Sequence, residues 1–169
     1  MTPTDPGHPL PNSNQLLLLK ACLWPNNNVA YFKSWAKYVD FENDVEWSSY
    51  RLLPLLYDKL KVELKDEPIG ARLKGIYRKH WSATHILLNK ALPALKALKQ
   101  AKVRVLLLKG IPLGVQYYKN VALRPMADVD LMVPREERQK AAKVLISLGF
   151  TLKDKIDLEN WLCCYYQKI

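Results

Sequence analysis

Apolar side chains recur every three or four positions along the first hundred residues, with polar and charged side chains between them. This spacing is typical of amphipathic helices, which bury one face and expose the other. It predicts four helices, over residues 16–24, 29–41, 47–62 and 69–99. Prolines punctuate the pattern: Pro25 ends the first helix, Pro54 has to lie near a helix start or a kink, and Pro93 bends the last helix. The first part of the chain is therefore predicted to be helical.

After Gln100 the pattern changes to β-branched and apolar runs separated by polar breaks. The predicted elements are a buried strand over 103–108, a helix over 111–118, a strand over 129–133, a helix over 135–148 and a short strand over 150–152. Gly149 stands where glycine commonly ends a helix. Residues 158–166 are apolar and aromatic without a clear period. The order of elements in this part is β-α-β-α-β.

These patterns predict an α+β protein in three parts. Residues 1–14 contain four prolines and form a disordered leader, residues 15–100 form a helical subdomain, and residues 101–169 form a core with a small mixed sheet. The apolar content of 49% is enough for a hydrophobic core. All five tryptophans fall on apolar faces and are predicted to be buried: Trp24, Trp35, Trp47, Trp81 and Trp161.

The net charge is +10, with 14 basic against 9 acidic residues in 1–100 and 12 against 7 in 101–169. Such a charge favours an anionic partner, for instance a nucleotide, a nucleic acid or an acidic protein. Because it is spread evenly, without a basic tail or patch, a solvated basic surface is favoured over dedicated nucleic-acid binding. Three cysteines without a CxxC pair indicate a reducing, cytoplasmic location. The apolar runs are too short for a membrane span.

Two acidic residues, Asp128 and Asp130, are separated by one residue on the apolar run that predicts the second strand. Residues i and i+2 of a strand point to the same face, so both carboxylates are expected to project side by side. Carboxylates held this close repel each other unless a cation compensates, and a hard divalent metal is the usual partner. The simpler alternative is a strand entrance, with one aspartate capping a turn and the other in solvent. The pair is predicted to be a metal site.

The break after the first predicted strand is Lys109-Gly110, directly before a predicted helix. Glycine at a strand-to-helix turn permits close backbone approach, and the N–H groups that begin a helix suit a phosphate. Lys109 adds a positive charge there. An exposed lysine beside a simple helix-start glycine is the alternative. With a metal at Asp128 and Asp130, the turn predicts a site for phosphoryl-group chemistry.

Several spaced motifs carry a resemblance to a known family. They are Leu107-Leu108-Lys109-Gly110, Leu113, Tyr117-Tyr118 and the run from Arg124 to Pro134 that contains Asp128-Val129-Asp130. Together with Val45-Glu46-Trp47 and Pro54-Leu55-Leu56 upstream, they resemble the uncharacterised nucleotidyltransferase-like family of the DNA polymerase β superfamily, over about residues 45–150. The resemblance implies a nucleotidyltransferase-like core in residues 101–169.

The resemblance also implies a reaction and roles for residues. Asp128 and Asp130 would ligate one or two Mg²⁺ (or Mn²⁺), and Lys109 and Gly110 would contact the triphosphate of an NTP. Arg124 would brace the loop or a phosphate, and a salt bridge from Arg124 to either aspartate is the equal alternative. The implied reaction transfers a nucleotidyl group from the NTP to an acceptor hydroxyl on a small molecule, a protein or an RNA.

The sequence departs from the superfamily pattern in two places. Ile111 follows Lys109-Gly110 where the superfamily usually has Gly-Ser or Gly-Gly, and a third carboxylate on a later strand is missing from the pattern. Three acids lie near the end, Asp154, Asp157 and Glu159, but none is on a clear apolar strand. We therefore expect a core that is incomplete at its C-terminus. The alternative function is a catalytically degenerate module that binds nucleotide, protein or nucleic acid.

The remaining candidate residues favour packing roles. His80 and His85 are five positions apart rather than the four of a helical metal pair. Cys163-Cys164 has no metal-ligand spacing and no neighbouring base, which favours burial. These residues add no second candidate site.

Overall fold

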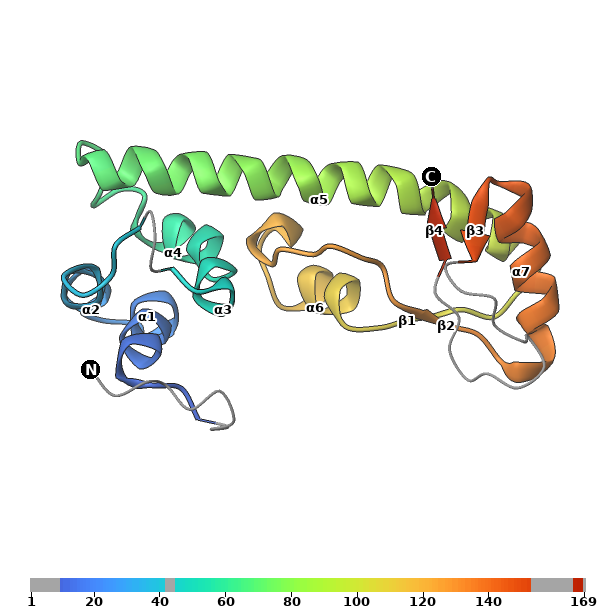
Figure 1. The fold of residues 1–169 in the computed structure, drawn as a ribbon, viewed down its shortest axis with the longest axis horizontal. Helices are drawn as coiled ribbons and strands as arrows, with labels where there is room; N and C mark the ends of the chain where they lie inside the picture. Colours follow the sequence, from blue (N-terminus) through green and yellow to red (C-terminus); the bar gives the residue numbers. More distant parts are fainter. Residues whose placement is uncertain (1–9, 42–44, 153–165, 169) are drawn as a thin grey trace. The chain divides into compact units, whose positions relative to one another are not determined.

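The computed structural model describes residues 10–41, 45–152 and 166–168, and it is rich in helix, with two small antiparallel sheets (Figure 1). This composition agrees with the predicted α+β class. The chain divides into two compact units. Unit 1 comprises Met1–Ser82 and Tyr118–Pro125, and unit 2 comprises Ala83–Tyr117 and Met126–Ile169. The predicted boundaries at residues 14 and 100 stay predictions.

All regular elements in the described residues of unit 1 are helices. Its elements are α1 (Ser13–Leu23), α2 (Asn28–Ala36), α3 (Trp47–Tyr50), α4 (Leu53–Leu60), the first part of α5 (Pro68–Gln100) and the 3-10 helix η1 (Val121–Leu123). Asn12 starts α1 with a capping box, in which the Gln15 N–H donates to Asn12 Oδ1 and the Asn12 N–H donates to Gln15 Oε1, both at 2.8 Å. Each predicted helix is thus present, although the third is divided into α3 and α4.

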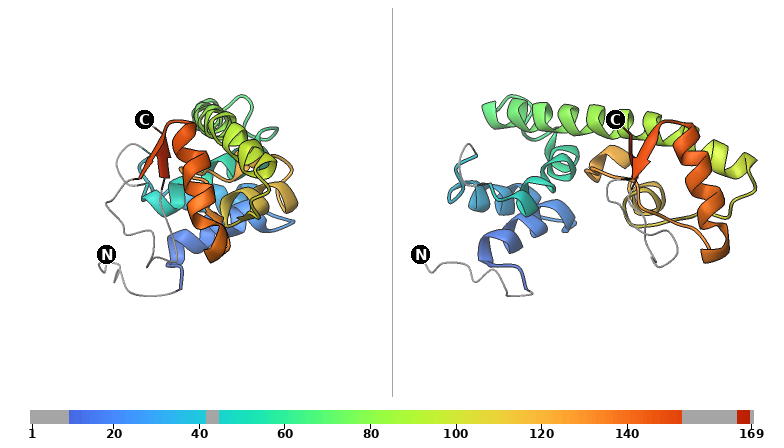
Figure 2. Two further views of the ribbon diagram at one scale, coloured as in Figure 1. Left: turned by 90° about the vertical axis from the view of Figure 1, so that its right-hand side faces the viewer. Right: turned by 45° about the vertical axis from the view of Figure 1, so that its right-hand side comes forward.

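The long helix α5 has 33 residues and continues through Pro93 (Figures 1 and 2). Proline removes one backbone hydrogen bond from a helix interior, and the predicted consequence was a bend. The helix does not end at that residue. Its first part contributes Leu73 to the core of unit 1, and its last part contributes Ala94 and Leu98 to the core of unit 2.

The core of unit 1 is built around Trp35 and Phe32 of α2. The Trp35 ring lies edge-on to Phe41, with centroids 5.2 Å apart, an arrangement that aromatic rings prefer. Aliphatic side chains of the other helices and of the turn between α4 and α5 complete the cluster: Leu18, Leu53, Leu56, Leu60, Leu64 and Leu73. The helical spacing of apolar residues therefore selected the correct buried face for α2 and α4.

The prediction that the tryptophans are buried is correct for Trp35 and wrong for Trp24, Trp47 and Trp81, which are exposed. Trp47 is 70% exposed and stacks on Tyr50, within the four-residue helix α3. Because α3 and α4 are separate helices, the apolar stripe read from one continuous helix does not extend to Trp47. Trp161 and Cys163-Cys164 lie outside the described residues.

Unit 2 combines the end of α5 with short strands and helices. In chain order these are β1 (Leu106–Leu107), α6 (Gly110–Gln116), β2 (Leu131–Met132), the 3-10 helix η2 (Arg135–Glu137), α7 (Arg138–Ser147), β3 (Phe150–Leu152) and β4 (Tyr166–Lys168). The predicted strands 103–108 and 129–133 are reduced to two residues each. A residue counts as part of a strand only where it pairs with a neighbouring strand in regular register. In the β1–β2 ribbon this regular pairing is limited to two residues of each strand.

The two sheets of unit 2 are both antiparallel. Strand β1 pairs with β2, with Leu106 opposite Met132 and Leu107 opposite Leu131, and β3 pairs with β4. The predicted mixed sheet is therefore wrong for the described residues. The connection through α6 returns the chain in the reverse direction, so the two strands form a ribbon and not a parallel β-α-β unit.

The β1–β2 ribbon has one buried and one exposed face. Val105, Leu131 and Val133 pack against a core formed by Ala94, Leu98, Val103, Ala141 and Leu145. Leu106 and Met132, which are directly opposite each other in the ribbon, are exposed. This alternation agrees with the pattern predicted for the second strand. The first strand was predicted to be buried, and the exposure of Leu106 shows that this prediction is wrong. At the far end of α7, Gly149 has a φ of 82°, which accounts for glycine at this helix end.

Candidate functional site

The end of the β1–β2 ribbon from which the chain continues into α6 brings the two predicted motifs together. Beyond the paired strands, the Leu108 N–H donates a hydrogen bond of 2.9 Å to the Asp130 carbonyl oxygen. This bond places Lys109 and Asp130, from segments more than twenty positions apart, beside each other. The sequence predicted that Asp130 lies within the second strand, and this is wrong: Asp130 directly precedes β2.

Lys109 and Asp130 form an ion pair, with 3.1 Å between Lys109 Nζ and Asp130 Oδ2. The two side chains differ in exposure: that of Lys109 is 69% exposed and that of Asp130 only 18%. A carboxylate that is largely withdrawn from water needs a cation or donors near it. The ammonium group of Lys109 meets that need in this structure.

The backbone of Lys109 has a conformation that favours glycine, with φ 52° and ψ −100°. A residue with a Cβ atom in such a region costs on the order of 1–3 kcal/mol, and such strain concentrates at functional sites. Lys109 also precedes α6 as its N-cap residue, without a side-chain hydrogen bond to the helix. The strain therefore falls on the residue that carries the charge.

Gly110 begins α6, as predicted, but the helix is short. It has seven residues, and its third residue, Pro112, has no N–H group to offer a phosphate. The dipole of such a short helix is weak because few peptide units are aligned. Any phosphate contact at this turn would therefore depend mainly on the Lys109 ammonium.

Asp128 is exposed and lies in the irregular segment before β2. The argument that residues i and i+2 share a face applies to regular strands, so it does not place the Asp128 side chain here. In residues 10–41, 45–152 and 166–168, no group of three or more His, Cys, Asp or Glu side chains could hold a metal ion. The acids Asp154, Asp157 and Glu159 lie outside the described residues.

Arg124 belongs to unit 1, where its backbone N–H donates 3.3 Å to the Val121 carbonyl and closes η1. Its expected role at a phosphate, and the alternative salt bridge to an aspartate, stay predictions. The sequence considered Arg124 as the internal partner of the aspartates. The structure pairs Asp130 with Lys109, a contact that the sequence analysis did not name. The signal that could have found it is the position of both residues at the same end of a two-stranded ribbon.

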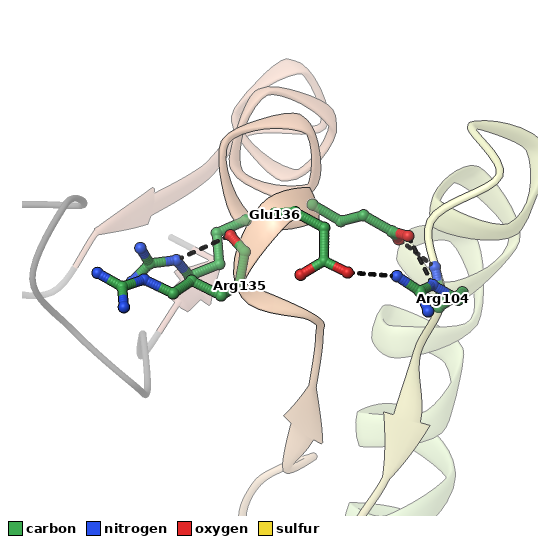
Figure 3. A network of polar contacts seen from close by, with 5 residues as sticks. Arg104, Arg135 and Glu136 are labelled. Carbon is green, nitrogen blue, oxygen red and sulfur yellow. Dashed lines mark hydrogen bonds and ion pairs between the residues drawn. The ribbon is translucent and has the colours of Figure 1, made fainter.

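A second polar cluster, missed by the sequence, joins the two segments at the other end of the ribbon (Figure 3). The Arg104 guanidinium donates to Glu137 Oε1 at 2.7 Å and to Glu136 Oε1 at 2.6 Å, and the Arg104 N–H donates to Glu137 Oε2 at 2.6 Å. We call these three residues the Arg104 clamp. It connects the chain before β1 to the chain after β2.

The Arg104 clamp shifts the acid–base properties of its members. Hydrogen bonds from Arg104 lower the pKa of Glu137, and a hydrogen bond from its own N–H, followed by Arg104, lowers the pKa of Glu136. The same contacts, first with Glu137, raise the pKa of Arg104. Every member is therefore held in its charged form.

Two other reactive side chains have packing roles. Burial raises the pKa of the Cys22 thiol to about 12, which keeps it protonated and a poor nucleophile. His80 packs against the Tyr50 ring at 5.5 Å, and burial, with a smaller contribution from Lys79, lowers its pKa. In the part of the chain that the structure describes, no helix is long and apolar enough to cross a membrane.

The sequence model of a family described as uncharacterised nucleotidyltransferase matches residues 48–168, so the chain belongs to this family. The match includes all five predicted site residues: Lys109, Gly110, Arg124, Asp128 and Asp130. No curated protein and no solved structure gave a match. The further expectation of a DNA polymerase β superfamily core stays a prediction.

Proposed function

We propose that the protein is a metal-dependent nucleotidyltransferase that transfers a nucleotidyl group from an NTP to an acceptor hydroxyl. Family membership supports the class of reaction. The single observation that supports the location is the ion pair between Lys109 and Asp130 at the end of the ribbon. The site unites a carboxylate for a metal with an ammonium group for a phosphate.

The carboxylates suit Mg²⁺ or Mn²⁺. Asp130 already has a cation 3.1 Å from one carboxylate oxygen, and Asp128, two residues away, is exposed. Carboxylate oxygens are the ligands that these hard ions take, and such sites are often completed by substrate phosphates. When bound, the ion would supply positive charge that offsets the charge of the triphosphate.

The residues of the chain would orient the substrate. Lys109 would hold a phosphate by charge, and Gly110, which has no side chain, would let the triphosphate approach the turn. In the reaction the acceptor oxygen bonds to the α-phosphorus, the bond from that phosphorus to the bridging oxygen of pyrophosphate breaks, and the hydroxyl proton leaves to solvent. The acceptor class (small molecule, protein or RNA) and the cytoplasmic location stay part of the proposal.

Calorimetric titration of an NTP with and without Mg²⁺ or Mn²⁺ tests the site, and release of pyrophosphate tests the reaction. We expect metal-dependent binding that Asp128→Asn and Asp130→Asn each weaken, whereas the matched Asp66→Asn in unit 1 leaves it unchanged. NTP binding that ignores both the metal and the two site substitutions would contradict the proposal.

A non-catalytic binding module is the second candidate. It is favoured by the absence of a third acidic ligand at Asp128 and Asp130 among the described residues. Metal-dependent NTP binding without pyrophosphate release, with any of the three acceptor classes present, would support the module over the enzyme. Pyrophosphate release that Asp130→Asn abolishes would support the enzyme.

A further inference from the structure

We propose that Lys109 is an exchangeable internal counter-ion. It neutralises Asp130 while the site is empty, and its ammonium moves to the triphosphate when metal and nucleotide bind together. The inference rests on the proposed function and deepens it, because it predicts that the two ligands bind cooperatively and names the residue that couples them.

The exposure of the two partners supports an exchange. Asp130 is largely buried and has to be neutralised by some cation, whereas the Lys109 side chain is mostly exposed and reaches Asp130 with its terminal ammonium. An ammonium on an exposed, flexible stem gains little from such a pair and can leave it without exposing apolar surface. The pair therefore satisfies the carboxylate through the exposed end of the lysine side chain.

The backbone around the pair can stay in place during the exchange. The Leu108 N–H is bonded to the Asp130 carbonyl at 2.9 Å, and the Lys109 carbonyl accepts from the Leu113 N–H at 3.3 Å. Both bonds involve main-chain atoms only. Rotation about the side-chain bonds of Lys109 is then enough to move Nζ from Asp130 to a triphosphate bound at the Lys109-Gly110 turn.

The strained backbone of Lys109 is an independent observation. Glycine would adopt φ 52° and ψ −100° without strain, so the local fold alone does not favour lysine at this position. Neutralising Asp130 explains a positive charge near this turn, but not why that charge is on a residue with a strained backbone. A role for the ammonium in binding accounts for its presence.

Cooperative binding follows from the charges. A divalent ion that binds Asp130 has to displace the ammonium, and the two cations then repel each other. A triphosphate that accepts the ammonium removes this repulsion. The metal alone should therefore bind weakly, and the nucleotide should raise the affinity for the metal. By linkage, the metal should raise the affinity for the nucleotide by the same factor.

Calorimetric titrations with Mn²⁺ alone, with a non-hydrolysable NTP analogue alone and with both test this coupling. The variants are Lys109→Met, which removes the charge and keeps a long side chain, and Asp130→Asn. Lys102→Met is the matched control, because Lys102 is also an exposed lysine of unit 2 with a positive φ, of 55°. Thermal unfolding of each variant checks that it is folded.

We expect Lys109→Met to bind Mn²⁺ alone about tenfold more tightly than wild type and to lose most of the coupling between metal and nucleotide, while Lys102→Met behaves as wild type. Equal Mn²⁺ affinity of Lys109→Met and wild type would overturn the inference, and so would weaker Mn²⁺ binding in the variant.

The inference and the proposed function can fail separately. If Asp130→Asn abolishes Mn²⁺ binding while Lys109→Met leaves it unchanged, the metal site is supported and the counter-ion role of Lys109 is wrong. If neither wild type nor Lys109→Met binds Mn²⁺, with or without the analogue, both the metal site and the inference are wrong. Binding by Lys109→Met where wild type binds only with the analogue would support both.

Discussion

The two ends of the β1–β2 ribbon are closed by different kinds of ion pair. At one end, three hydrogen bonds from the guanidinium and the backbone N–H of Arg104 hold Glu136, which is exposed, and Glu137, whose side chain is only 19% exposed. At the other end one ammonium meets one largely buried aspartate, from a strained backbone. Arginine presents a planar fork that several acceptors can hold, whereas lysine offers a single, mobile charge. The clamp therefore suits a structural tie, and the Lys109–Asp130 pair suits an exchange of partners.

The largest difference between the two ends is expected in ligand binding. Asp130→Asn should weaken metal-dependent NTP binding by at least about 100-fold, since even outer partners of metal ligands contribute up to that much. Glu137→Gln in the clamp should leave it nearly unchanged. Calorimetry on both variants makes the comparison, and a similar loss in both would show that the ribbon acts only as a scaffold.

Lys109→Arg should convert the exchangeable pair into one that resembles the clamp. Arginine can bind the Asp130 carboxylate with two parallel hydrogen bonds and would release it less readily. We expect Mn²⁺ alone to bind about fivefold more weakly than to wild type, opposite to the effect of Lys109→Met. Arg104→Lys, the reciprocal change at the clamp, is the control. Tighter Mn²⁺ binding by Lys109→Arg would contradict the comparison.

Backbone strain should separate the two ends in stability. Lys109→Gly and Lys109→Ala both remove the ion pair, but only glycine relieves the positive φ, so Lys109→Gly should be more stable by about 1 kcal/mol. Arg104 has no positive φ. There the order should reverse, with Arg104→Gly about 0.5 kcal/mol less stable than Arg104→Ala. Urea unfolding measures all four, and the same order at both positions would exclude strain at Lys109.

The smallest effect concerns pH. The folded state lowers the pKa of Glu136 and Glu137, so the unfolded chain takes up protons first as the pH falls. The clamp's contribution to the free energy of unfolding is present at neutral pH. It is lost as the pH falls below the ordinary titration range of glutamate. Urea midpoints across this range should fall less steeply for Arg104→Met than for wild type. Parallel curves would show that the clamp adds nothing measurable, as holds for many exposed ion pairs.

Local sequence patterns predicted the helices and the family, because both predictions rest on short stretches of the chain. The spacing of Leu53, Leu56 and Leu60 correctly selected a buried face, and Gly149 correctly marked the end of α7. The resemblance carried by Lys109-Gly110 and Asp128-Val129-Asp130 agrees with the family to which the chain belongs. The roles assigned to these residues remain to be tested.

The errors arose where a distant segment decides the outcome. Strand length depends on the partner strand, so the long β-branched run before Lys109 became a two-residue strand. The exposure of Trp47 depends on where one helix ends and the next begins. The ion pair of Lys109 with Asp130 depends on how the ribbon pairs its two strands, which no single stretch of the sequence shows.

The sequence by itself determined which residues carry charge, which faces are apolar and which family the motifs resemble, since these properties belong to short stretches of chain. Only the tertiary structure decided that β1 and β2 pair antiparallel and that this pairing sets Lys109 against Asp130. The reason is that hydrogen bonds between strands act across more than twenty intervening residues. The pattern of any one stretch does not encode them.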